Sequence, residues 1–156
     1  MNRIRIRNGR IIDPAGGRDE TADLLVVDGA IAAAGNAASG PVEREIDASG
    51  QWVIPGLVDL HARLREPGQE HKGTIASETA AAARSGVTTL CCPPDTDPVI
   101  DTPAVAEHIH HRASAAGHAR VLPLGALTHG LAGEHLAELA ALSEAGCVAV
   151  GNARHA

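Results

Sequence analysis

A repeating order of strand, loop and helix after residue 55 constrains the fold of this 156-residue chain more than any other feature. In the first unit, an apolar strand at 57–61 precedes an Ala-rich helix at 74–85. Gly86 follows this helix, as glycine commonly follows the last turn of a helix. Strands that alternate with helices predict a parallel sheet with the helices packed outside it. The sequence therefore predicts an α/β fold.

The same order repeats twice and then begins again. We expect strands at 87–92 and 121–126, helices at 102–116 and 134–145, and a fourth strand from Cys147. A closed β/α barrel needs eight such units and about 250 residues, so three units and one strand cannot close it. Because an uncovered sheet edge is a liability, we expect a fragment of a longer protein. The alternative is that other copies of the chain cover the open edge.

Residues 1–54 show a different pattern, one of short β-strands. Asn8-Gly9 and Asp28-Gly29 each lie between apolar segments, as in a two-residue hairpin turn. This pattern predicts a small antiparallel unit, and we find no chemical cluster within it.

Composition excludes several classes of protein. The net charge is −6 and no stretch is basic enough to indicate nucleic-acid binding. No window has the roughly 18 consecutive apolar residues of a membrane span, and the N-terminus lacks the apolar core of a signal peptide. The chain has three cysteines, Cys91, Cys92 and Cys147, and an odd number does not fit a disulfide framework. We interpret them as small apolar side chains that fill space. We therefore expect a cytoplasmic protein that binds neither nucleic acid nor membrane.

The stretch from Pro55 to Gly68 carries the strongest chemical signal. The apolar run delivers His61 to the end of a predicted strand, where residues two apart share one face. A His-x-His pair at such a place can bind one metal ion, which activates a water molecule. Arg63 stands at the second position, and a protonated guanidinium has no lone pair to offer a metal. Taken alone, His61 is more often structural than metal-binding.

Longer strings in this region resemble the cyclic amidohydrolase superfamily, and dihydroorotase in particular. The strings are Pro55-Gly56-Leu57-Val58-Asp59-Leu60-His61, Leu64-Arg65-Glu66-Pro67-Gly68, Gly86-Val87-Thr88-Thr89-Leu90-Cys91-Cys92-Pro93 and Asp97-Pro98-Val99-Ile100-Asp101. The resemblance implies that residues 1–54 form the small β-sandwich subdomain of the family. It also implies that residues 55–156 form the first half of a (β/α)8 TIM barrel, incomplete in this chain.

The resemblance implies a metal-activated hydroxide, normally on zinc, that opens and closes the dihydroorotate ring in pyrimidine biosynthesis. His61 matches the first metal-binding histidine, and Arg63 replaces the second. Arg65 matches the arginine that grips the substrate carboxylate, a task that suits a guanidinium fork. Asp95 stands where active members usually carry a substrate-contacting asparagine. A carboxylate there would repel an anionic substrate.

A third departure follows the fourth strand. Active bacterial members resembling this chain carry a Ser-Asp-Asp-Gly-type motif that supplies a metal ligand, and the matching segment is Val150-Gly151-Asn152-Ala153. The segment has no carboxylate, and the amide oxygen of Asn152 is a poor ligand for zinc. We therefore expect zinc, the metal of the family, to be absent or weakly bound here.

The pattern is similar to the inactive dihydroorotase-like chains that accompany aspartate carbamoyltransferase in some bacteria. This implies a catalytically silent protein that acts as a structural or regulatory partner of the transferase, with self-association also possible. The alternative is an active metal-dependent cyclic amidohydrolase, with His61 and ligands from beyond residue 156. Such an enzyme would hydrolyse dihydroorotate to N-carbamoyl-aspartate or be hydantoinase-like. A remnant with no function is a third alternative.

The remaining histidines carry weaker signals. His108 and His111 are i, i+3 neighbours in the second predicted helix and could chelate a metal adventitiously, although a solvated helix face is the simpler interpretation. His129 and His135 lie near a strand-to-helix loop, with no carboxylate that the sequence places beside them. No serine lies in the G-x-S-x-G context of a nucleophile.

Overall fold

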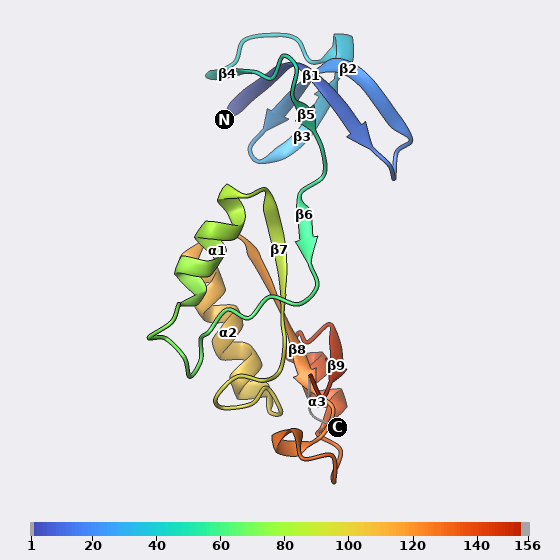
Figure 1. Cartoon of the computed structure of the whole chain (residues 1–156). Coiled ribbons are helices and arrows are strands. Elements are labelled where there is room, and N and C mark those ends of the chain that lie inside the picture. Colours follow the sequence, from blue (N-terminus) through green and yellow to red (C-terminus); the bar gives the residue numbers. More distant parts are fainter. Residues whose placement is uncertain (1, 154–156) are drawn as a thin grey trace. The chain divides into compact units, whose positions relative to one another are not determined.

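The computed structural model describes residues 2–153, which fall into two compact units, Met1–Pro55 and Gly56–Ala156. Figure 1 shows the first unit as strands with one short helical turn, and the second as alternating strands and helices. None of the helices among the described residues is long and apolar enough to cross a membrane.

The first unit is one mixed sheet of five strands. The elements are β1 (Arg3–Asp13), β2 (Arg18–Val27), β3 (Ala30–Ala34), the short 3-10 helix η1 (Gly35–Ala37), β4 (Arg44–Asp47) and β5 (Trp52–Val53). β2 pairs antiparallel with β1 and β3, but β4 and β5 both pair parallel with β1. The prediction of a wholly antiparallel unit is therefore wrong. Residues 2–55 form a single sheet, so they do not themselves supply the second layer of a β-sandwich.

Asn8 and Gly9 do not form the predicted hairpin turn. β1 runs through both residues, and its register with β2 shifts between Ile6 and Gly9, as at a β-bulge. Asn8 has a φ of +59°, whereas a type I′ turn needs two successive residues of positive φ. The predicted turn at Asp28-Gly29 has such a pair, with φ values of +48° and +83°, and is confirmed.

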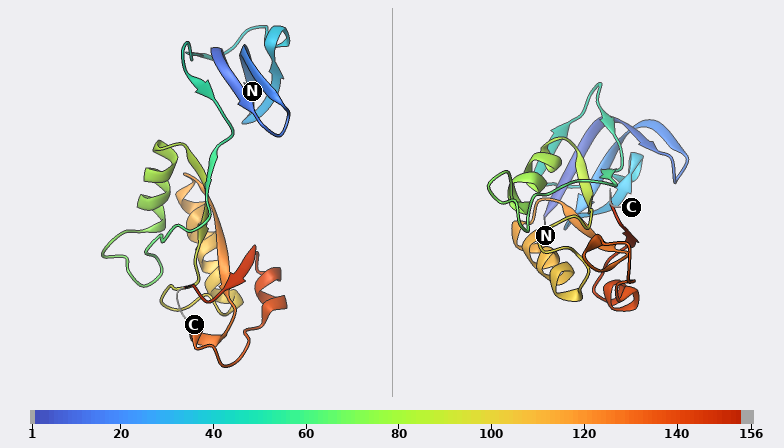
Figure 2. Two further views of the ribbon diagram at one scale, coloured as in Figure 1. Left: turned by 45° about the vertical axis from the view of Figure 1, so that its right-hand side comes forward. Right: turned by 60° about the horizontal axis from the view of Figure 1, so that its bottom comes forward.

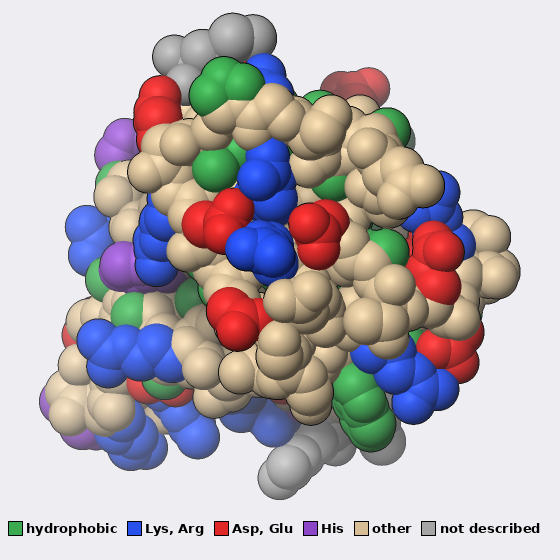
Figure 3. Space-filling view, turned by 90° about the horizontal axis from the view of Figure 1, so that it is seen from above, with side chains coloured by type: hydrophobic (Ala, Val, Ile, Leu, Met, Phe, Trp, Pro, Cys, Tyr) green, Lys and Arg blue, Asp and Glu red, His purple; other side chains and the backbone are tan. Residues whose placement is uncertain are grey.

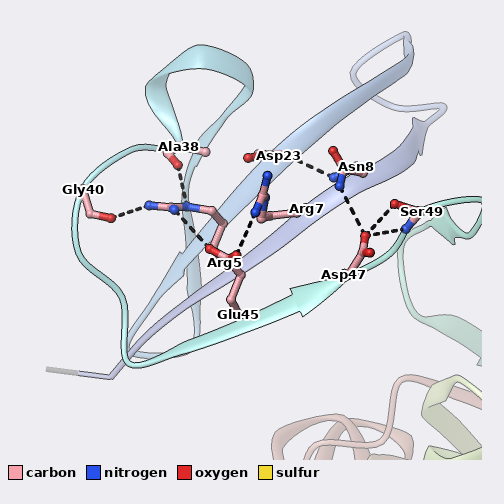
Figure 4. A network of polar contacts seen from close by, with 9 residues as sticks. All are labelled: Arg5, Arg7, Asn8, Asp23, Ala38, Gly40, Glu45, Asp47 and Ser49. Carbon is pink, nitrogen blue, oxygen red and sulfur yellow. Dashed lines mark hydrogen bonds and ion pairs between the residues drawn. The ribbon is translucent and has the colours of Figure 1, made fainter.

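Polar side chains tie β1 to β4 and to the loop before it (Figure 4). The Nη1 atoms of Arg5 and Arg7 lie 3.2 and 3.0 Å from the two carboxylate oxygens of Glu45. Arg5 also donates to the backbone oxygens of Ala38 and Gly40. Figure 3 shows positive and negative side chains interspersed on the face that it presents. Each exposed ion pair contributes little to the free energy of folding. We therefore infer that this network mainly fixes the register of β4 against β1.

The second unit has the predicted alternation. Its elements are β6 (Leu57–Asp59), α1 (Ile75–Arg84), β7 (Val87–Cys92), α2 (Pro103–Ala116), β8 (Arg120–Ala126), the 3-10 helix η2 (His129–Leu131), α3 (Leu139–Glu144) and β9 (Ala149–Gly151). The strands form one parallel sheet in the order β6-β7-β8-β9 (Figure 2). Three βα units and one further strand are therefore confirmed.

Local signals explain where α1 and α2 begin and end. The Thr74 hydroxyl accepts a hydrogen bond from the backbone N–H of Ser77, and the Ser77 hydroxyl accepts one from Thr74, which forms a capping box. Pro103 occupies the first turn of α2, where its missing N–H costs nothing. Gly117 ends α2 with a φ of +67°, the left-handed conformation that glycine adopts without strain.

The third helix is shorter than predicted. The expected span of 134–145 contracts to α3 because the residues before it pair with the preceding segment instead. The N–H of Ala137 bonds to the Leu127 oxygen at 3.0 Å, and Leu136 is 65% exposed. Leu142, within α3, is fully buried, so only the helical half of the predicted segment packs a leucine into the core.

One apolar core lies between the sheet and the helices of the second unit. Its largest buried members come from all layers and are Leu64, Ile75, Leu90, Ile100, Ile109, Val121 and Leu142. Leu64 and Ile100 belong to the loops after β6 and β7, so the core also anchors the first two loops that carry the predicted site residues.

Candidate functional site

His61 lies beyond the end of β6 and not on it. β6 stops at Asp59, whose Oδ1 accepts the backbone N–H of His61 at 2.9 Å. Such a local bond offers the backbone a turn in place of the sheet. The prediction that His61 and Arg63 share a strand face is therefore wrong, and the side chain of His61 is exposed.

Arg63 is paired with Asp95. Its Nε and Nη2 atoms donate to the same carboxylate oxygen, Oδ2, at 2.9 and 2.7 Å. The two side chains are 24% and 21% exposed, so the pair is largely removed from solvent. The structure thus joins two residues that the sequence marked separately. The carboxylate of Asp95 is neutralised by a cation from its own chain.

Arg65 points to its own loop. Its Nη1 atom lies 3.4 Å from Oε1 of Gln69, the residue is exposed, and its φ is +66°. A hollow of about 20 Å³ is lined by Arg63, Arg65, Asp95 and Gln69, among others. That volume holds about one water molecule. It is far too small for a cyclic substrate. A wider groove of about 520 Å³, lined by His61, Arg63, Arg65 and residues of α1, lies open to solvent.

Asn152 is hydrogen-bonded to the loop that follows β8. Its Oδ1 accepts two hydrogen bonds from Thr128, one from the backbone N–H at 3.1 Å and one from the hydroxyl at 3.0 Å. The Thr128 hydroxyl oxygen in turn accepts the N–H of Gly133 at 3.0 Å. The oxygen that could have faced a metal ion is therefore engaged within the chain. Ala153 follows with a φ of +50°.

These residues do not suit a zinc ion. Across residues 2–153, no three His, Cys, Asp or Glu side chains are arranged to hold a metal. A zinc site normally uses thiolate, imidazole or carboxylate ligands, while the matching positions offer one imidazole, a guanidinium and an amide already bonded. The donor set of the described residues therefore disagrees with the metal expected from the resemblance.

Two contacts near the site were not predicted from sequence. Asp101 accepts the N–H of Gly130 at 2.9 Å, and its Oδ2 lies 3.6 Å from Nδ1 of His129. Glu66 is 4% exposed and accepts from the N–H of Ile75 and from Nε of Arg112. Glu66 and Asp101 both lie within strings that resemble the dihydroorotase family, and this resemblance is the sequence signal that could have pointed to them.

The cysteines and the helix histidines carry no second site. Cys91, Cys92 and Cys147 are buried and free, as predicted for apolar fillers. Burial raises the pKa of the Cys92 thiol to about 12, which removes its nucleophilic thiolate at neutral pH. His108 and His111 lie exposed on α2, in agreement with a solvated helix face.

Comparison with known proteins identifies the family. Residues 50–156 match the family described as "Dihydro-orotase-like". A dihydroorotase-like protein of Pseudomonas aeruginosa is 53% identical over 153 residues, which cover 97% of this chain and 36% of that protein. A dihydroorotase of Syntrophotalea carbinolica is 49% identical, covering 98% of this chain and 36% of that protein. The chain thus spans about a third of the length of the curated relatives it matches.

Solved structures agree on the fold. An L-hydantoinase (dihydropyrimidinase) from Arthrobacter aurescens matches with a TM-score of 0.79 and 26% identity, over 96% of this chain and 32% of that chain. A dihydroorotase matches with a TM-score of 0.71 and 20% identity, over 96% of this chain and 42% of that chain. These matches confirm the predicted fold, the first part of an amidohydrolase barrel that these residues do not complete. The family match covers more than half of the residues, and the chain belongs to the dihydroorotase-like family.

Proposed function

We propose that this chain is a catalytically silent dihydroorotase-like protein of pyrimidine biosynthesis, in the cytoplasm. The observation that carries the proposal is the ion pair between Arg63 and Asp95. At the position that resemblance gives to the second metal-binding histidine stands the guanidinium of Arg63, which is already paired with Asp95. The histidine that the resemblance implies is thus replaced by an arginine, which has no lone pair to offer a metal ion.

The neighbouring residues support the same conclusion. The matching position of the fourth-strand ligand is Asn152, whose oxygen already accepts two hydrogen bonds from Thr128. By resemblance, Asp95 and Arg65 would both have to contact a dihydroorotate anion, but Asp95 is bonded to Arg63 and Arg65 lies against Gln69. These contacts support the proposal that the family chemistry is lost.

We further propose that the protein serves as a structural or regulatory partner of aspartate carbamoyltransferase. Two observations support a retained structural role. The capping box of α1 is complete and the second unit has a buried core, although the predicted site residues depart from the pattern that resemblance implies. A scaffold that remains ordered after its metal ligands are lost suits a protein used for its surface.

The second candidate function is an active cyclic amidohydrolase, for either dihydroorotate or a hydantoin. His61 favours it, because its side chain is exposed beside the wide groove and an imidazole there could still bind a metal. This candidate needs ligands that the described residues do not supply.

Metal content and ring-opening activity separate the two functions. The protein expressed from its natural gene would be purified without chelator, its zinc measured, and its turnover tested on dihydroorotate and hydantoin with added zinc or manganese. We expect substoichiometric zinc and no turnover. Stoichiometric zinc together with ring opening would contradict the proposal and favour the second candidate.

The partner is tested separately by co-expression with aspartate carbamoyltransferase from the same source. We expect the two proteins to elute together in size-exclusion chromatography, earlier than the transferase expressed alone. Separate elution at micromolar concentration would contradict the partner role. Whether the protein is catalytically silent would still be decided by the zinc and activity measurements.

A further inference from the structure

Side-chain contacts join the loops that follow the four parallel strands, in chain order. Because the strands are parallel, their carboxyl ends lie at one edge of the sheet, and so do these loops. We name the set of three contacts the seam. The seam consists of the pairs Arg63–Asp95, Asp101–Gly130 and Thr128–Asn152.

The first contact joins the loop after β6 to the loop after β7, and other contacts reinforce it. The N–H of Asp97 bonds to the backbone oxygen of Pro67 at 3.2 Å. A Cβ added at Gly68 would lie only 2.5 Å from Cβ of Asp97, so the two loops approach as closely as a glycine allows. The Arg63–Asp95 pair therefore lies across an interface that is already tight.

The second and third contacts continue along the same edge. Asp101, from the loop after β7, accepts the N–H of Gly130 in the loop after β8. Thr128, from that same loop, donates twice to Asn152, which directly follows β9. Each loop is thus joined to the next one by at least one side-chain hydrogen bond.

The positions of the seam residues coincide with the departures from active relatives. Resemblance assigns a metal or substrate role to the positions at which this chain carries Arg63, Asp95, Asn152 and Ala153. The first three make seam contacts. These changed residues are therefore engaged with partners on the adjacent loops.

We propose that the seam is a permanent latch that holds the loop edge of the second unit in one arrangement without metal or substrate. This inference rests on the proposed function, because it assumes that no catalysis takes place at this edge. The cation that pairs with Asp95 is the side chain of Arg63. Unlike a metal ion, it cannot dissociate from the protein or be removed by a chelator. The loop edge is therefore insensitive to the ligands of the family.

Hydrogen exchange measured by mass spectrometry on the whole chain tests the latch. The variants are Arg63→Gln, Asp95→Asn and the two together, and Asn152→Ala removes the third contact independently. Arg10→Gln is the matched control, because Arg10 binds Asp19 at 2.7 and 2.8 Å in the first unit but with both side chains about half exposed. Thermal unfolding confirms that each variant is folded.

We expect either single variant to speed exchange roughly tenfold in both loops, residues 60–74 and 93–102. The double variant should exchange no faster than the singles, because each single change already breaks the same contact. Asn152→Ala should speed exchange in residues 127–138, and Arg10→Gln should change neither loop. Wild-type exchange should be the same with zinc, with a chelator and with dihydroorotate.

Two results would overturn the latch. Additive effects of Arg63→Gln and Asp95→Asn would show that the residues act separately. Slower loop exchange in wild type with zinc or dihydroorotate would show that the edge still responds to family ligands. Neither result depends on turnover, so failure of the latch is distinguishable from failure of the silent-protein proposal, which zinc content and ring opening decide.

Discussion

Arg112 on α2 donates from Nε to Oε1 of Glu66 at 2.6 Å, and so binds the second helix to the first loop. The other oxygen of Glu66 accepts the N–H of Ile75, the first residue of α1, at 2.7 Å. A carboxylate is favourable at a helix N-terminus, because unpaired N–H groups and the helix dipole both favour negative charge. One buried side chain therefore fixes two helices and a loop.

Replacing Glu66 should lower stability strongly. Glu66→Gln keeps the shape but turns one acceptor into a donor that faces Arg112 or the N–H of Ile75. We expect the free energy of unfolding in urea to fall by about 2 kcal/mol, the cost of leaving a buried donor without an acceptor. Glu107→Gln, on the exposed face of α2, is the control and should change it by less than about 0.5 kcal/mol. Equal losses in both variants would contradict the assigned role of Glu66.

Arg63→His alone should not restore stoichiometric zinc. The chain turns away from the sheet after Asp59, so His61 and residue 63 do not share a strand face. The oxygen of Asn152 also remains bonded to Thr128. Zinc content after dialysis against excess metal measures the outcome. Arg63→Gln is the control that removes the guanidinium without adding an imidazole. Stoichiometric zinc in Arg63→His, but not in Arg63→Gln, would show that one residue separates this chain from a metal protein.

The stability of the chain should fall as the pH rises above about 9. Burial raises the pKa of Cys92 from 9.0 to about 12 and raises that of Cys147 as well, because a thiolate is poorly solvated in the core. Above pH 9 the unfolded chain loses thiol protons that the folded chain keeps. The sign of the linkage is therefore destabilising, at about 1.4 kcal/mol per pH unit for each fully responding thiol.

Urea midpoints at pH 8, 9 and 10 measure this effect, because these values span the ordinary thiol pKa of 9.0. Cys92→Ala should give a shallower fall over that range, although it starts from lower stability because it leaves a cavity. A slope identical to that of wild type would show that Cys92 does not carry the linkage.

Gly68→Ala should destabilise the chain more than Gly86→Ala. Its φ is +103°, and a Cβ there would lie 2.5 Å from Cβ and 2.6 Å from the backbone oxygen of Asp97. Gly86→Ala is the matched control, since Gly86 has a φ of +83° with nothing within 4 Å of its Cβ position. Backbone strain alone should cost Gly86→Ala about 1 kcal/mol, and the steric clash should at least double that for Gly68→Ala. Equal unfolding free energies in the two variants would contradict the close approach of the loops.

Sequence patterns predicted most of the second unit correctly because they report local physics. The β7 and α2 boundaries follow from apolar periodicity, from Pro103 in the first turn and from Gly117 at the end. Errors occurred where partners distant in the chain decide the outcome. Asn8-Gly9 has the composition of a turn, yet parallel pairing of β1 with β4 and β5 on either side of it keeps the strand continuous. The first half of the predicted third helix is likewise drawn into pairing with Leu127 and Thr128.

The amino-acid sequence by itself determined the alternating fold and the family, because periodicity and motif identity are properties of the chain. Resemblance alone marked Arg63, Asp95 and Asn152 as changed residues. Only the tertiary structure decided what those changed residues do. Arg63 and Asp95 are 32 positions apart, and Thr128 and Asn152 are 24 apart. Their contacts depend on which loops the parallel sheet brings to one edge. Hydrogen bonds act over about 3 Å, and no local pattern specifies such a distance between loops.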